Sequence, residues 1–167
     1  MKTRLIGDIH GKLYDYQIVI ENVERSIQVG DFGIGFADDY WHDKVDFIHA
    51  DGRHRFIRGN HDNPAKCRDD MAGYIPDVSV ENDVMLIGGA WSIDWQWRTP
   101  GINWWEDEEL SMEECHRAME IYVATKPRVM ITHDAPTSVT HDMFVKAGLA
   151  LGGADAPVIK TKTGQLF

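Results

Sequence analysis

The chain has 167 residues, of which 43% are hydrophobic and 26% are charged, and this composition is ordinary for a single globular domain over residues 1–167. Asp and Glu (27) outnumber Lys and Arg (17), which gives a formal net charge of −10, and the basic residues form no cluster. A long nucleic acid is therefore not favoured as a partner, because binding to its backbone depends on clustered positive charge. A small phosphate compound stays open, since a bound divalent metal can supply that charge.

No segment of the sequence predicts export or insertion into a membrane. The N-terminal "MKTRLIGDIHG" has no apolar signal-peptide core, and no apolar run approaches the roughly 20 residues that span a bilayer. Cys67 and Cys115 lack the spacing of a metal or redox motif. We expect a soluble cytoplasmic protein with no membrane association, no disulfide and no obligate protein partner.

Strands and helices are predicted to alternate along the chain. The expected elements are, in chain order, a strand at 3–7, a helix at 13–24, strands at 26–30, 54–59 and 83–89, a helix at 110–123 and a strand at 128–132. Ser111 and Glu114 have the Ser-x-x-Glu spacing of a capping box, which marks the start of the second helix. This alternation predicts an α/β protein in which helices pack on sheet.

Four of the predicted strands end in the same way. An apolar run is followed by Gly or Thr and then by Asp, Asn or His in "LIGDIH", "IQVGDFG", "FIRGNHD" and "VMITHD". In open α/β sheets ligands gather at the carboxyl ends of the strands, so the polar side chains of these four segments are expected to meet. Their mixture of carboxylate, amide and imidazole groups, without thiolate, suits Mn, Fe or Zn better than Mg alone. The candidate ligands are Asp8, His10, Asp31, Asn60 and His133.

Taken in order, "GDIHG", "GDFG", "GNHD" and "THDAP" resemble the first four signature blocks of the calcineurin-like metallophosphoesterase superfamily, from residue 5 to about residue 136. The resemblance implies an αββα sandwich with two divalent metal ions at the carboxyl ends of the strands, with Mn favoured and Fe or Zn as alternatives. It also implies ligand assignments. Asp8 and His10 match ligands of the first ion, Asp31 matches the carboxylate that bridges both ions, and Asn60 and His133 match ligands of the second ion.

The activity implied by the resemblance is hydrolysis of phosphomonoesters or phosphodiesters by a hydroxide bound to the two metal ions. His61 is then the proton donor to the leaving group, and Asp62 is expected to orient the His61 ring. The partner of such a site is a phosphate-ester substrate. The alternative is a catalytically silent protein of the same fold that acts as a scaffold or binding protein.

Two features depart from the family pattern. The second block reads "GDFGIGF" and lacks the second aspartate and the arginine of the protein-phosphatase branch, so a general phosphoesterase is favoured over a protein phosphatase. A fifth block, Gly-His-x-His, is expected after "THDAP" and does not occur. Three explanations stay open: the sequence belongs to a longer chain and the fold is C-terminally incomplete, His141 replaces the block, or the second ion is held weakly. The first explanation is favoured.

A tryptophan-rich segment, "WSIDWQWRTPGINWW", spans residues 91–105. Large aromatic side chains most often anchor a loop through their buried area, and this is the favoured interpretation. The alternative is a wall of the substrate crevice on which a base or sugar stacks, with Arg98 gripping phosphate through its planar fork of donors. Arg98 is therefore a candidate substrate-binding residue.

The remaining polar clusters have ordinary interpretations. The acidic residues of "WWEDEEL" precede the predicted helix start at Ser111 and are expected to form a solvated face. Four histidines have no partners at useful spacing and are expected at the surface: His42, His49, His54 and His116.

Overall fold

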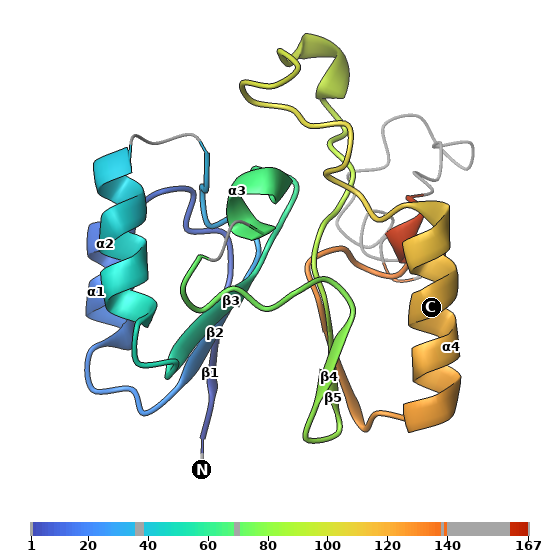
Figure 1. Cartoon of the computed structure of the whole chain (residues 1–167), viewed down its shortest axis with the longest axis horizontal. Helices are drawn as coiled ribbons and strands as arrows, with labels where there is room; N and C mark the ends of the chain where they lie inside the picture. The colour runs from blue at the N-terminus through green and yellow to red at the C-terminus, as the bar shows by residue number, and fades with distance from the viewer. Residues whose placement is uncertain (1, 36–38, 69–70, 138, 140–160, 167) are drawn as a thin grey trace.

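A computed structural model of the chain describes residues 2–35, 39–68, 71–137, 139 and 161–166 (Figure 1). The elements are β1 (Arg4–Ile6), α1 (Leu13–Ile20), β2 (Ser26–Val29), α2 (Asp39–His49), β3 (His54–Ile57), α3 (Pro64–Arg68), β4 (Ser79–Glu81), β5 (Val84–Ile87), the 3-10 helix η1 (Trp95–Trp97), α4 (Met112–Thr125), β6 (Val129–Thr132) and the 3-10 helix η3 (Thr163–Gln165). None of the described helices combines the length and the apolar character needed to cross a membrane.

The chain is mixed α/β, as predicted, and each predicted strand contains an observed one. The two predicted helices correspond to α1 and α4, although α1 ends at Ile20 rather than at residue 24. The sequence analysis did not predict α2, α3, β4 or the two 3-10 helices η1 and η3.

The strands form two three-stranded sheets. In the first sheet β1, β2 and β3 lie in that order and run parallel, so that Ser26 of β2 pairs with Arg4 on one side and His54 on the other. In the second sheet β5 lies between β4, which is antiparallel to it, and β6, which is parallel to it. Figure 1 shows the two sheets side by side, with α1 and α2 outside the first and α4 outside the second. The layer order is therefore helix, sheet, sheet, helix.

Three apolar clusters hold these layers together. The cluster between the two sheets includes Ile57 from β3 and Leu86 from β5. The cluster beneath α1 and α2 includes the stacked rings of Phe32 and Phe56, whose centroids are 5.0 Å apart. The cluster beneath α4 includes Ala118. Each fully buried Ile, Leu or Phe side chain stabilises the fold by about 1.5–3 kcal/mol.

The sheet topology determines where the candidate ligands lie. Because β1, β2 and β3 are parallel, their carboxyl ends meet at one edge of the first sheet, and Asp8, Asp31 and Asn60 follow them there. His133 follows Thr132, the last residue of β6 in the second sheet. The polar residues after four strands, drawn from both sheets, are thus placed near one another.

Side-chain caps fix where two of the helices begin. Ser111 Oγ accepts the backbone N–H of Glu114 at 3.2 Å, and the Glu114 carboxylate accepts the backbone N–H of Ser111 at 2.8 Å, which confirms the predicted capping box of α4. Helix α3 begins at Pro64, and Asn63 Oδ1 accepts the N–H of Ala65 at 3.0 Å. The chain therefore turns into a helix directly after the "GNHD" segment.

The expectation that the isolated histidines lie at the surface is wrong for His49 and His54, which are both buried. His49 accepts a hydrogen bond from the Tyr16 hydroxyl at Nε2 (3.0 Å) and donates from Nδ1 to the Ala72 carbonyl (3.2 Å). These bonds replace the water that the ring would otherwise bind. His116 is exposed, as expected, and the side chain of His42 lies outside the described part of the structure.

The acidic run ahead of α4 is also only partly solvated. Glu106 and Asp107 are exposed, as expected, whereas Glu108 and Glu109 are buried. Each buried carboxylate accepts hydrogen bonds from another part of the chain, Glu108 from Ser92 and Glu109 from residues of the segment 161–166. These partners are distant in sequence, so the pattern of acidic residues does not reveal them.

Candidate metal centre

Asp31 lies at the centre of the predicted ligands. Its Oδ1 accepts the backbone N–H of His61 at 2.9 Å and is 3.3 Å from His133 Nε2. Its Oδ2 is 2.8 Å from His61 Nδ1 and 3.6 Å from His10 Nε2. One buried carboxylate thus faces three histidines that follow three different strands.

Asp31 belongs to two groups of potential metal ligands. The first group consists of His10, Asp31 and His61, and the second of Asp8, Asp31 and His133. Within each group the potential ligand atoms lie within 4.8 Å of one another. The family resemblance assigns Asp8 and His10 to the same ion, whereas this geometry pairs Asp8 with His133 and His10 with His61. The described residues therefore provide two adjacent ligand sets that share one carboxylate.

Asn60 joins the second group through His133. His133 Nε2 lies 3.2 Å from Asn60 Oδ1, and His133 Nδ1 donates to the Val29 carbonyl at 2.8 Å. Because a carbonyl only accepts, this bond fixes the ring with Nε2 directed at Asp31 and Asn60, as is usual for metal-binding histidines. All five predicted ligands therefore meet. His141, the candidate replacement for the missing fifth block, lies outside the described residues.

The charges of Asp31 and His133 stabilise each other. Burial acts to raise the pKa of Asp31, but hydrogen bonds from His133 and His61 outweigh burial and hold this pKa well below its usual range. Burial likewise acts to lower the pKa of His133, but the hydrogen bond and the negative charge of Asp31 raise it to about 9. Asp31 is therefore an ionised carboxylate in a buried place, where it attracts positive charge.

The backbone around the centre adopts conformations that most residues avoid. Asp8, His10 and Asp31 have φ angles of 45°, 44° and 56°, in the left-handed region. Such conformations cost about 1–3 kcal/mol each and gather at functional sites. Gly59 permits the close approach of the ligands, since a Cβ there would lie 2.2 Å from Asp31 Oδ1 and 2.7 Å from His133 Nε2. The fold thus maintains local strain where these side chains converge.

Asp62 does not orient the His61 ring, which corrects the expectation from sequence. Its buried carboxylate accepts the backbone N–H groups of residues 32–34 and of Gly59, at 2.6–3.1 Å. The carboxylate beside His61 Nδ1 is that of Asp31. Asp62 instead holds the loop after β2 against the end of β3.

Arg98 lies against the His61 ring, so the predicted substrate-binding residue does reach the centre. Its Nη2 forms a close hydrogen bond with His61 Nε2. Because a guanidinium group has no acceptor, Nε2 accepts, and the proton of the neutral ring is on Nδ1, facing Asp31. The other nitrogens of Arg98 are held within its own loop, Nε by Asp94 (2.7 Å) and Nη1 by the Asn103 carbonyl (3.1 Å). Arg98 therefore directs one nitrogen, Nη2, to the centre instead of a pair of nitrogens that could bind phosphate together.

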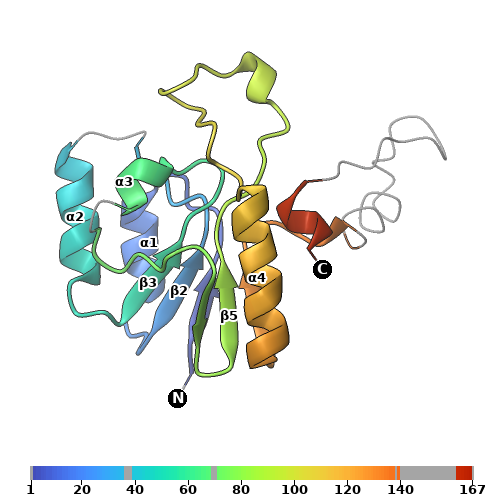
Figure 2. The same cartoon turned by 45° about the vertical axis from the view of Figure 1, so that its right-hand side comes forward.

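The tryptophan-rich segment projects beyond the end of the two sheets (Figures 1 and 2). Trp105 is buried, so the predicted anchoring role applies to it, and the rings of Trp95 and Trp104 lie 6.0 Å apart. Trp97, in contrast, is 83% exposed. Anchoring therefore explains only part of the segment.

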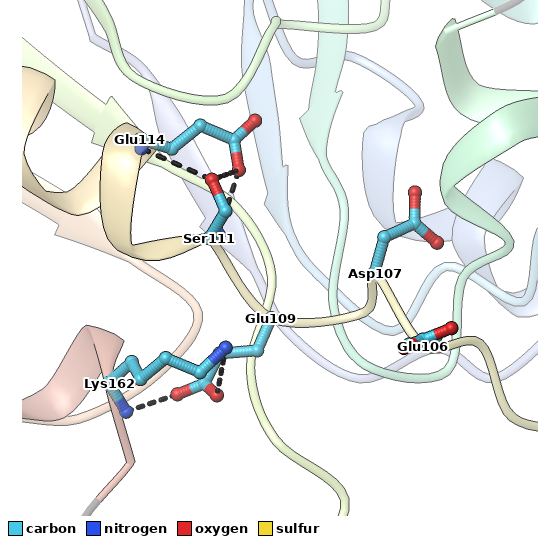
Figure 3. A pocket seen from close by; sticks show the side chains of 6 residues that line it. All are labelled: Glu106, Asp107, Glu109, Ser111, Glu114 and Lys162. Atoms are coloured by element: carbon cyan, nitrogen blue, oxygen red, sulfur yellow. Dashed lines mark hydrogen bonds and ion pairs between the residues drawn. The ribbon is translucent and has the colours of Figure 1, made fainter.

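A cavity of about 360 Å³ lies beside the start of α4 (Figure 3), and none of the predicted site residues lines it. The lining residues are Glu106, Asp107, Glu109, Ser111, Glu114 and Lys162. Most of their charged groups already have partners: Glu114 closes the capping box, Asp107 accepts from Arg68 Nη1 at 2.7 Å, and Glu109 lies 3.3 Å from Lys162 Nζ. These charged groups of the cavity therefore form hydrogen bonds and ion pairs that hold neighbouring parts of the chain together.

Asn60 also makes a contact that its sequence neighbours do not predict. Its Nδ2 donates to Ser92 Oγ at 3.0 Å, and Ser92 in turn bonds to Glu108. The three residues come from separate segments, and no local motif connects them.

Comparisons of the chain with protein-family models, with curated proteins and with solved structures gave no match. The four sequence blocks and the geometry of the centre are therefore the features that point to a function.

Proposed function

We propose that this chain hydrolyses phosphate esters with two divalent metal ions, as members of the calcineurin-like metallophosphoesterase superfamily do. One observation carries the proposal: at the carboxyl ends of strands, the Asp31 carboxylate faces His10 through Oδ2 (3.6 Å) and also forms a group of potential metal ligands with Asp8 and His133. Two-metal hydrolases bind their ions close together, and Asp31 would be the ligand that both ions share.

The donor set fits divalent transition metals. Carboxylate and amide oxygens and imidazole nitrogens, without thiolate, suit Mn, Fe or Zn, and we propose Mn first. The residues that would hold the ions are Asp8, His10, Asp31, Asn60 and His133. When bound, the two ions would supply positive charge to the phosphoryl oxygens and an activated water molecule.

The chain itself would supply orientation and a proton. His61 is held by Asp31 through Nδ1 and faces Arg98 through Nε2. A leaving-group oxygen that took the place of Arg98 at Nε2 would receive its proton from a protonated His61 ring. The guanidinium of Arg98, whose Nη2 already reaches this place, would contact the phosphate. We therefore assign His61 the role of general acid and Arg98 that of a substrate-binding residue.

The layered fold supports the same proposal. Its order of helix, sheet, sheet and helix is the order of the αββα sandwich that the four sequence blocks imply, with the candidate ligands at the carboxyl ends of strands. On these grounds we propose that the chain has the metallophosphoesterase fold.

Turnover of p-nitrophenyl phosphate and bis(p-nitrophenyl) phosphate by the Mn²⁺-equilibrated chain tests this function. We expect hydrolysis of at least one ester, loss of hydrolysis when EDTA removes the metal, and recovery when Mn²⁺ is restored. A chain that binds two ions per molecule yet hydrolyses neither ester with Mn²⁺, Fe²⁺ or Zn²⁺ would contradict the enzymatic proposal and favour a scaffold of the same fold.

A further inference from the structure

The side chain of Asn60 is held at both ends of its amide. Its Oδ1 lies 3.2 Å from His133 Nε2, inside the candidate metal centre, and its Nδ2 donates to Ser92 Oγ at 3.0 Å. Ser92 is buried and belongs to the tryptophan-rich segment. The nitrogen end of the amide is therefore anchored outside the centre.

A buried carboxylate sets the direction of the Ser92 hydroxyl. Glu108, which is 2% exposed, accepts the backbone N–H of Ser92 at Oε1 (2.6 Å) and the Ser92 hydroxyl at Oε2 (2.8 Å). The Ser92 hydroxyl has one proton, which it donates to Glu108, so the Ser92 oxygen accepts from Asn60. Donation therefore runs from Asn60 to Ser92 to Glu108, which gives the amide a single orientation.

The main chain of Glu108 is itself closely packed. Its carbonyl accepts from Arg58 Nη1 at 2.5 Å and from the backbone N–H of Ala90 at 3.2 Å. A Cβ on Gly89 would lie 2.7 Å from this carbonyl oxygen, so only glycine permits this approach. The carboxylate that directs Ser92 is thus attached to a well-fixed part of the backbone.

The orientation of an amide decides whether it can serve as a metal ligand. The carbonyl oxygen has lone pairs for a cation, whereas the NH₂ group has only donor hydrogens, and the two ends differ little in size. We propose that Ser92 and Glu108 are positioning residues, which hold Asn60 so that its carbonyl oxygen faces a cation bound beside Asp31 and His133. This inference rests on the proposed function, because it assumes that a cation binds there.

Mn²⁺ affinity measured by isothermal titration calorimetry, on the whole chain and on Glu108→Gln, tests the inference. Gln has the shape of Glu but can place a donor NH₂ against the Ser92 hydroxyl, which would turn the Ser92 proton toward Asn60 and favour the inverted amide. We expect the ion beside Asn60 to bind about 10- to 100-fold more weakly, the usual effect of changing a residue that orients a ligand. The matched control is Glu109→Gln, which changes a buried carboxylate that bonds to the Thr163 N–H instead, and it should leave the affinity unchanged.

A second pair of variants separates orientation from general loss of structure. In Asn60→Asp both terminal atoms of the side chain are oxygens, so a cation meets an oxygen whichever way the group is turned. Ser92→Ala should weaken Mn²⁺ binding by about 10- to 100-fold in the otherwise unmodified chain, and should have almost no effect in the Asn60→Asp background.

Equal Mn²⁺ affinity for the unmodified chain and Glu108→Gln would overturn the inference. An equal loss of affinity on Ser92→Ala in both backgrounds would overturn it too, since that result indicates damage to the fold rather than a lost orientation. Failure of the unmodified chain to bind Mn²⁺ would instead contradict the proposed function, and the inference with it.

Discussion

His61 is the residue through which the candidate centre would act on a substrate. Its backbone N–H and its Nδ1 both bond to the Asp31 carboxylate, at 2.9 and 2.8 Å, so Asp31 holds both the main chain and the ring of His61. Its other nitrogen, Nε2, is directed to Arg98. This geometry leaves one ring nitrogen on the side from which a phosphate ester would be contacted.

Replacing His61 with Ala should therefore reduce turnover of the p-nitrophenyl esters by about 100-fold or more, the usual contribution of a positioned general acid. Mn²⁺ content should not change, because the five proposed ligands remain. His116→Ala, which removes an exposed histidine on α4, should change neither quantity. Unchanged turnover in His61→Ala would refute the proton-donor role, and loss of Mn²⁺ would identify His61 as a ligand, in line with its proximity to His10 and Asp31.

At the scale of elements, Asp62 joins the end of β3 to the loop that follows β2. Asp62→Ala would leave the backbone N–H groups of residues 32–34 and of Gly59 without their acceptor. Since each buried unsatisfied group costs about 1–3 kcal/mol, we expect the free energy of unfolding in urea to fall by at least about 3 kcal/mol. Glu120→Ala, which removes an exposed carboxylate on α4, should leave stability nearly unchanged. Equal unfolding midpoints for Asp62→Ala and the unmodified chain would show that Asp62 does not hold this loop.

His49 makes the packing of α2 sensitive to pH. Burial lowers its pKa from 6.5 to about 4, and its neutral ring bonds to Tyr16 and Ala72. Below pH 6.5 the unfolded chain binds a proton on His49 that the folded chain does not, so stability falls as the pH decreases from about 6.5 to about 4. Between pH 7 and pH 4 the unmodified chain should lose about 3 kcal/mol more stability than His49→Gln, which keeps both kinds of hydrogen bond without titrating. Parallel losses in urea unfolding would contradict this role.

Some elements that the sequence analysis missed could have been predicted, and others could not. Strands β4 and β5 form a hairpin with the two-residue loop Asn82 and Asp83, whose φ angles are 47° and 66°. Asn and Asp are typical of such turns, so this hairpin has a local signal. Helix α2 has a weaker one, because among its described side chains, residues 43–49, only Val45 and the polar His49 are buried, and these do not make an apolar stripe.

The members of the candidate centre could be predicted, but their contacts could not. Each ligand follows an apolar run, and the carboxyl ends of parallel strands meet at one edge whatever the details of packing. The role of Asp62 depends instead on how the loop after β2 packs on the end of β3. The role of Glu108 depends on a hydrogen bond to Ser92, a residue in a different segment. Such contacts follow from the tertiary structure alone.

At the scale of the whole molecule, the candidate centre lies where the two sheets meet. Asp31 follows β2 in the first sheet, and His133 follows β6 in the second. The fully buried Arg58, at the end of β3, donates to Asp77 at 2.8 Å and to the Glu108 carbonyl at 2.5 Å. These bonds join the end of β3 to the segments that precede β4 and α4, and the apolar cluster packs β3 against β5. The centre therefore depends on the packing of both sheets.

The most direct test of the two-ion centre is the number of Mn²⁺ ions bound per chain, determined by elemental analysis after equilibration and removal of the excess. We predict two ions for the unmodified chain. Asp31→Asn should lose both, because the amide keeps a single acceptor oxygen and no charge to offer to two cations. Two ions in both proteins would contradict the shared carboxylate, and one ion or none in the unmodified chain would contradict the two-ion centre itself.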